Sequence, residues 1–148
     1  MELSSTPPQI GYNLHMSTPH PARRAIEEHA ARWNARDRER WLELFADEIV
    51  FEDPVGKAPK PGRTAAEGSW DNSYTEGRVW TLHPQRIVTG GDEAVVLMRN
   101  QGVVHGDEAV VDSIEIWKVR DDGKVVSVRA FFEQPTAVEL NPYFVPDS

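Results

Sequence analysis

The chain has 148 residues, a length that suits one domain with a core of its own. Its composition is 39% hydrophobic, with five Trp and five Phe, which is not the composition of a disordered chain. The formal net charge of -8 argues against nucleic-acid binding, which needs a basic face. The chain has no cysteine, which excludes disulfides, thiolate metal sites and cysteine nucleophiles.

No apolar run approaches the ~20 residues that span a bilayer, and the N-terminus has no apolar signal-peptide region. We therefore expect a soluble, cytoplasmic protein without a membrane partner. Prolines among Ser, Thr and Gln predict a flexible leader over residues 1–21. The domain is expected over residues 22–135, followed by an irregular tail over 136–148.

The first half of the chain predicts helices. The spacing of Ile26, His29, Ala30 and Trp33 is that of one buried helical stripe, so we expect a helix from Ala22 to Ala35.

A short second helix should follow, with Asp37 as its N-cap, and then a strand over Glu48–Asp53. The segment Thr64-Ala65-Ala66-Glu67 has the pattern of a capping box and predicts the start of a third helix.

The second half predicts strands separated by Gly- and Asp-rich turns. The expected strands are Val79–Val88, Ala94–Val104, Ala109–Val119 and Lys124–Phe132. The order of elements predicts an α+β fold, in which helices pack on one face of a curved, largely antiparallel sheet.

Three polar residues lie on faces that are otherwise apolar. Asp53 shares a strand face with Ile49 and Phe51, His29 lies within the first helical stripe, and Glu115 lies on a strand face with Trp117. Each has a structural interpretation: Asp53 as a turn residue, His29 as a hydrogen-bonded core residue, and Glu115 as an exposed one. Their recurrence around one predicted core favours a shared functional site.

Other motifs carry less information. The histidines His20, His83 and His105 have no partner at metal-ligand spacing, and no nucleophile elbow, Walker loop or dinucleotide fingerprint occurs. We therefore expect no metal and no cofactor. The five tryptophans are expected mainly in the core, with a subset lining a pocket.

Two blocks of the sequence resemble the ketosteroid isomerases (steroid Δ5-isomerases). They are Glu52-Asp53-Pro54-Val55-Gly56, with the Pro/Gly loop that follows, and Gly123–Phe132, which reads GKVVSVRAFF. The likeness extends over roughly residues 25–133. The wider relatives are the SnoaL-like polyketide cyclases and the nuclear-transport-factor-2-like superfamily. The resemblance implies a cone-shaped fold (a cystatin-like roll), with about three helices on a strongly curved mixed sheet, enclosing a pocket, and a homodimer.

The resemblance also implies roles for single residues. Asp53 falls on the family's general base, which moves a proton beside a ketone. His29 stands at the position of the family's oxyanion-hole Tyr, and Glu115 at that of its protonated Asp. A His and a protonated Glu can both donate hydrogen bonds. We expect Asp53 to be ionised and Glu115 to be neutral, because the site of Glu115 is apolar and a second carboxylate is close. A Tyr that packs near the family's base falls at about Trp70.

The expected ligand is an apolar polycyclic molecule such as a steroid, a polyketide or a terpenoid. We expect aromatic side chains to bind it, namely Trp33, Trp70, Trp117 and Phe132. The predicted activity is that of a steroid Δ5-isomerase. Three alternatives remain open: a polyketide cyclase, an epoxide hydrolase, and a binding module without catalysis.

Overall fold

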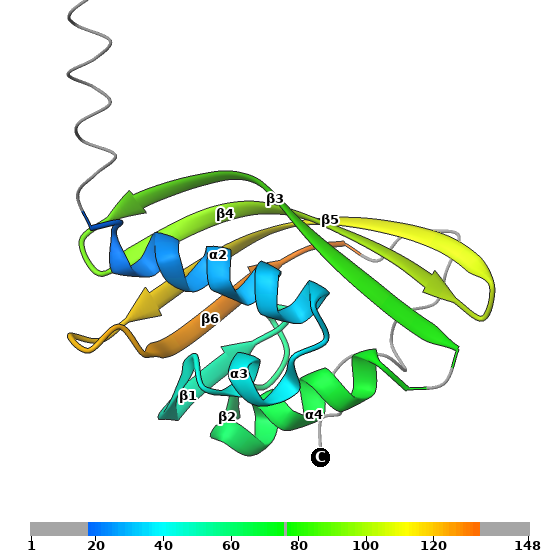
Figure 1. Ribbon diagram of the computed structural model, residues 1–148, viewed down its shortest axis with the longest axis horizontal. Coiled ribbons are helices and arrows are strands. Elements are labelled where there is room, and N and C mark those ends of the chain that lie inside the picture. The colour runs from blue at the N-terminus through cyan, green and yellow to red at the C-terminus, as the bar shows by residue number, and fades with distance from the viewer. Residues whose placement is uncertain (1–17, 76, 134–148) are drawn as a thin grey trace, which may run out of the picture.

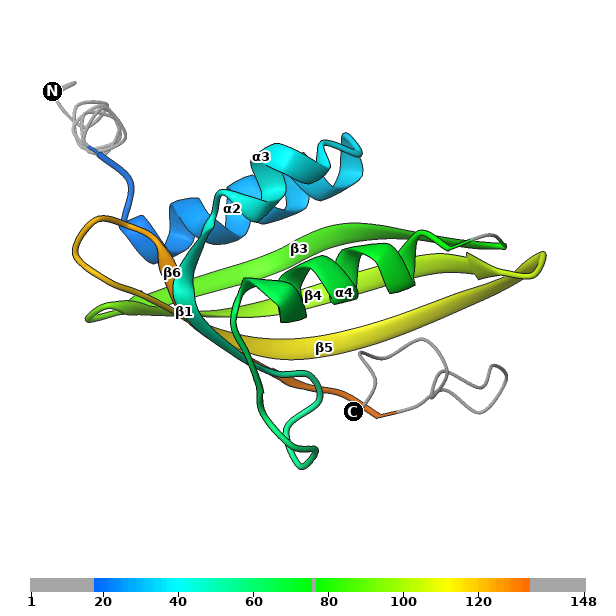
Figure 2. The same ribbon diagram turned by 90° about the horizontal axis from the view of Figure 1, so that it is seen from below.

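Three helices lie on one side of a strongly curved six-stranded sheet in the computed structural model, which describes residues 18–75 and 77–133 (Figures 1 and 2). The helices are α2 (Pro21–Asn34), α3 (Arg38–Leu42) and α4 (Arg63–Ser73). The strands are β1 (Phe45–Glu52), β2 (Lys60–Pro61), β3 (Arg78–Gly90), β4 (Glu93–Val104), β5 (Asp107–Val119) and β6 (Val125–Phe131). The predicted α+β architecture is confirmed.

The sheet is mixed, with strand order β2-β1-β6-β5-β4-β3. Strands β3 to β6 form the predicted antiparallel meander. The turn between β4 and β5 has two residues with positive φ, His105 at 51° and Gly106 at 88°, which suits a tight hairpin. A register shift between Pro84 and Arg86 interrupts the β3–β4 ladder. Such irregularities let long strands bend.

Helix α2 is tied to strand β3 by hydrogen bonds. The indole Nε1 of Trp33 donates to the backbone oxygen of Trp80 at 3.0 Å. The Asn34 side chain donates to the carbonyl of Leu82 and accepts from the Leu82 backbone N–H, at 2.8 and 2.9 Å. These bonds fix the C-terminal end of α2 over β3, with its apolar stripe turned towards the sheet.

Strand β1 pairs with β6 in parallel, and this pairing positions Asp53. Strand β1 ends at Glu52, one residue earlier than predicted, and Asp53 follows with a cis peptide bond to Pro54. The Val55 N–H donates to the carbonyl of Ala130 on β6 at 2.8 Å. Since Ala130 pairs with Glu115 on β5, the loop after β1 reaches the same part of the sheet as Glu115.

Two predicted details differ from the structure. Helix α4 begins at Arg63 with Gly62 as its N-cap, so Thr64 lies inside the helix and no side chain caps it. Gly62 has φ 88° and donates its N–H to Ile49, so the turn from β2 sets the start of the helix. Helix α2 begins at Pro21, with the His20 ring accepting from the Ala22 N–H.

The predicted leader and tail fall largely outside the described residues, over 1–17 and 134–148. No helix in the described part of the chain combines the length and apolar character needed to cross a membrane.

Candidate active site

A cavity of about 150 Å³ lies between the helices and the inner face of the sheet. Its apolar wall is mainly aromatic and includes Trp33, Trp41, Trp80, Trp117 and Phe132. Its polar wall includes His29, Asp53, Asn100, Ser113 and Glu115. An apolar cavity with a few convergent polar groups is the usual form of a small-molecule site.

His29 is held in one protonation state by its partner Trp41. The Trp41 indole Nε1 donates to His29 Nδ1 at 2.8 Å. Because an indole N–H can only donate, Nδ1 must carry a lone pair, and the neutral ring carries its proton on Nε2. Burial lowers the pKa of His29 to about 3, so the ring stays neutral. The ring is only 8% exposed, and the Nε2 proton is its remaining donor.

Glu115 is a buried carboxylate that accepts two hydrogen bonds from its own strand. The Ser113 Oγ donates to one carboxylate oxygen at 2.8 Å, and the Trp117 Nε1 donates to the other at 2.9 Å. Asn100 donates in turn to Ser113 Oγ at 3.2 Å. Burial raises the pKa of Glu115, while the bonds from Trp117 and Ser113 act in the opposite direction.

Asp53 lies at the open side of the cavity. It is an exposed residue by surface area, yet protein atoms crowd around its carboxyl group. This burial, together with the negative charge of Glu115, raises the pKa of Asp53 to about 7. Water at the exposed side of Asp53 stabilises its charged form and works against this shift. Among the described residues, none donates a side-chain hydrogen bond to it.

The two carboxyl groups therefore differ in how their charge is stabilised. Glu115 has two donors, whereas Asp53 has the charge of Glu115 nearby. In such a coupled pair, the group whose charged form accepts more hydrogen bonds ionises first. The hydrogen bonds thus favour an ionised Glu115 and an Asp53 that exchanges its proton near neutral pH. This order is the reverse of the one expected from the sequence.

All but one of the predicted site residues line the cavity. His29, Asp53 and Glu115 all line the one cavity, as do Trp33, Trp117 and Phe132. Trp70 does not line it: its ring packs behind Trp33 and Trp41, with centroids 4.9 and 5.3 Å away.

Sequence reasoning missed three contributors, Trp41, Trp80 and Asn100. Asn100 had a detectable signal, because it is a polar residue two positions from the buried Met98 on the inner face of β4. The role of Trp41 depends on a contact with another helix, which its local sequence does not encode.

Comparisons with known proteins agree with this geometry. The model of the SnoaL-like domain family matches residues 26–128. Among solved structures, RV0760c from Mycobacterium tuberculosis is 24% identical with a TM-score of 0.70, over 79% of this chain and 94% of that one. A second structure of RV0760c is a complex with estradiol-17beta-hemisuccinate.

Two further similar structures are enzymes of different kinds. The Delta 5-3-ketosteroid isomerase from Mycobacterium sp. is 22% identical with a TM-score of 0.69, over 78% of this chain and 95% of that one. SalBIII, an epoxide hydrolase/cyclase-like enzyme of pyran ring formation in the polyether salinomycin, is 23% identical with a TM-score of 0.69, over 76% and 91%. At these identities the likeness establishes a shared fold, which hosts more than one chemistry.

Proposed function

Because the chain belongs to the SnoaL-like domain family, we propose that it is an enzyme that moves a proton within an unsaturated ketone, in the manner of a steroid Δ5-isomerase. The observation that carries this proposal is that two carboxyl groups and a neutral imidazole line a single apolar cavity. Such a set can remove a proton beside a carbonyl group and stabilise the enolate that forms.

Asp53 is the general base in this proposal. Its pKa of about 7 lies where a general base is most effective at neutral pH. The ionised carboxylate takes a proton from the carbon beside the ketone, and the electron pair of that C–H bond moves into the enolate. Asp53 then returns the proton to the far carbon of the shifted double bond.

His29 is the donor to the enolate oxygen. Its Nε2–H is a neutral donor with a fixed tautomer, set by the bond from Trp41. As Asp53 is neutralised, the enolate gains the negative charge, so the net charge of the cavity is unchanged. Burial raises the pKa of Asp53 most, and the negative charge of Glu115 adds to that rise; in this proposal Glu115 has this role in place of the donor role expected from the sequence.

The replacement Asp53→Asn tests the proposal. With a β,γ-unsaturated ketone as substrate, the absorbance of the conjugated enone product reports turnover. We expect the rate to fall by about 10²–10⁴-fold, as for loss of a general base. The matched control is Asp112→Asn, which makes the same change on the outer face of β5, where Asp112 pairs with Arg99 at 2.9 Å. An Asp53→Asn variant as fast as the control contradicts the assignment.

The order of ionisation favours one second candidate, the opening of an epoxide by water. Below pH 7, an ionised Glu115 can take a proton from water while a protonated Asp53 donates to the epoxide oxygen. The water oxygen bonds to a ring carbon as the C–O bond breaks. Mass analysis of the product separates the two reactions, because hydration adds the mass of one water and isomerisation adds none.

We also propose that two copies of the chain associate through the outer face of the sheet. This face carries exposed apolar side chains: Val95, Leu97, Val110, Ile114 and Phe131. Apolar patches of this kind typically mark an interaction surface.

A further inference from the structure

Trp80 lines the cavity, and its ring packs against a glycine of the neighbouring strand. On strand β3, Trp80 lies directly opposite Gly102 of β4, which is buried. A Cβ added to Gly102 would lie within 2.6 Å of atoms of the Trp80 ring. The next residue across the sheet from Gly102 is Ala109 of β5, also small. Because Gly102 and Ala109 are small, the Trp80 ring can lie close to the backbone of the sheet at this position.

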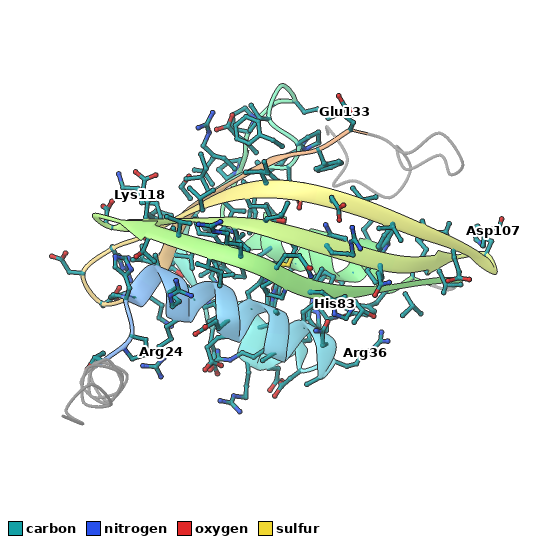
Figure 3. All side chains as sticks on the ribbon, turned by 90° about the horizontal axis from the view of Figure 1, so that it is seen from above. Arg24, Arg36, His83, Asp107, Lys118 and Glu133 are labelled. Atoms are coloured by element: carbon teal, nitrogen blue, oxygen red, sulfur yellow. The ribbon has the colours of Figure 1, made fainter. Side chains whose placement is uncertain are left out.

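The position of Trp80 is fixed by the backbone around it. Its carbonyl accepts the hydrogen bond from Trp33, and Leu82 is bound twice to Asn34. The row of Trp80, Gly102 and Ala109 lies near the turn of the long β4–β5 hairpin. Figure 3 labels Asp107 at this end of the hairpin and Lys118 at the other end. These three hydrogen bonds oppose a shift of strand β3 away from α2 at the position of Trp80.

The space that remains is small for the ligands expected from the sequence. The cavity volume is about 150 Å³. Drug-sized ligands occupy pockets of roughly 300–1,000 Å³, and an apolar cavity of about 150 Å³ holds a single benzene ring. The described residues that line the cavity include no Lys or Arg, so this wall has no permanently charged cation to pair with a phosphate group.

We propose that the substrate is an uncharged, one-ring unsaturated ketone or epoxide, and that Trp80, seated on Gly102, sets this size limit. The proposal rests on the function proposed above, since it concerns the same cavity. It differs from the polycyclic ligand expected from the sequence: four fused rings exceed the space that Trp80 leaves.

Binding without turnover tests the size limit directly. The probes are two conjugated enones, carvone with one ring and androst-4-ene-3,17-dione with four fused rings, each titrated by calorimetry or ligand-observed NMR. We expect the wild-type protein to bind carvone and to show no saturable binding of the steroid. In Trp80→Ala, we expect saturable binding of the steroid to appear, with an affinity at least about tenfold above the weakest that the titration detects, because a large side chain has left the wall.

The matched control is Leu97→Ala, which removes an apolar side chain from the outer face of the sheet, where Leu97 is 42% exposed. It should leave the binding of both probes unchanged. Wild-type protein that binds the steroid as tightly as carvone overturns the proposed size limit. A folded Trp80→Ala variant that gains no steroid binding overturns the role of Trp80.

A double-mutant cycle tests the packing contact between Trp80 and Gly102 without any ligand. Gly102→Ala should lower the melting temperature in the wild-type background, because its methyl group meets the Trp80 ring. In the Trp80→Ala background, the same change should cost much less, since the ring is absent. Equal costs in the two backgrounds contradict the contact.

The binding experiments can fail or succeed independently of the proposed isomerase activity. A protein that binds carvone but does not isomerise one-ring unsaturated ketones keeps the size limit and loses the chemistry. A protein that isomerises steroids keeps the chemistry and loses the size limit.

Discussion

Two of the carboxylates on strand β5, Glu115 and Asp112, lie on opposite faces of the sheet, and their pKa values are shifted in opposite directions. Glu115 on the inner face is 8% exposed and accepts hydrogen bonds from neutral donors, and burial raises its pKa. Asp112 on the outer face accepts both bonds of the Arg99 guanidinium, which lowers its pKa. The two residues are three positions apart on one strand. The face of the sheet, and not the residue type, therefore decides the direction in which the pKa of each carboxylate shifts.

The largest difference between the inner face and the rest of the sheet is expected in kcat, when a histidine is replaced. His29→Phe removes the inner-face donor to the enolate, and we expect kcat to fall by about 10²–10³-fold, as for loss of one oxyanion donor. His83→Phe makes the same change on β3 outside the cavity wall and should leave kcat unchanged. Steady-state kinetics on both variants measure the difference, and equal rates for the two variants contradict the role of His29.

The His29→Phe variant also loses the acceptor for Trp41. A buried donor left without a partner costs about 1–3 kcal/mol, so its melting temperature should fall. His29→Gln serves as a second variant, because its amide can both accept from Trp41 and donate into the cavity. Partial recovery of kcat in His29→Gln, relative to His29→Phe, separates catalysis from stability.

The pH dependence of stability should have opposite signs on the two faces. The folded protein binds the Asp53 proton more tightly than the unfolded chain, because its pKa rises from 3.8 to about 7. This contribution to stability is complete below the unfolded pKa and is lost as the pH rises towards 7. Asp53→Asn stays neutral throughout, so it should gain about 2–4 °C in melting temperature over the wild type between pH 5 and pH 8. We expect only this modest gain because water reaches Asp53.

For Asp112, the lowered pKa makes its contribution present above the unfolded pKa and lost in acid. Asp112→Asn should therefore lose stability relative to the wild type as the pH rises from 3 to 5. Melting temperatures of both variants and the wild type, measured from pH 3 to 5 and from pH 5 to 8, give the direction of each change in stability. A common sign would remove the distinction between the faces.

The smallest effect on catalysis is expected from the apolar outer face. Ile114 is 51% exposed, between the cavity-facing Ser113 and Glu115. Ile114→Glu should shift the proposed dimer towards monomer, because a charge then replaces an apolar contact. The turnover per chain should stay unchanged, because this side chain points away from the cavity. Light scattering with size-exclusion chromatography measures the mass, and a monomeric wild type contradicts the proposed dimer.

The residues that face the cavity from helix α2 and strand β5 were predictable from the sequence, because each follows from a local periodicity. The stripe of Ile26, His29, Ala30 and Trp33 placed α2 correctly, because helical periodicity is a local property of the sequence. Strand alternation placed Glu115 beside Trp117 for the same reason. The family resemblance then assigned His29, Glu115 and Asp53 to one pocket, and all three line the cavity.

What the sequence did not predict depends on contacts between distant segments. The contact of Trp80 with Gly102 requires the β3–β4 register, in which residues 22 positions apart lie opposite each other. The parallel pairing of β1 with β6 joins segments from the two halves of the chain. The proton order of Asp53 and Glu115 depends on the approach of the loop after β1 to β5, because the donors to Glu115 lie on its own strand while Asp53 comes from the first half of the chain.

The pH dependence of kcat/KM for the wild type and for Glu115→Gln tests the central claim, that the charge of Glu115 tunes Asp53 as a base. The wild-type rate should rise with pH through a midpoint near 7 and then level off, since kcat/KM reports the free enzyme. In Glu115→Gln the negative charge is gone, so the midpoint should fall by about one pH unit, while burial keeps it above the usual carboxyl value. An unchanged midpoint in Glu115→Gln would contradict the coupling of the two carboxylates.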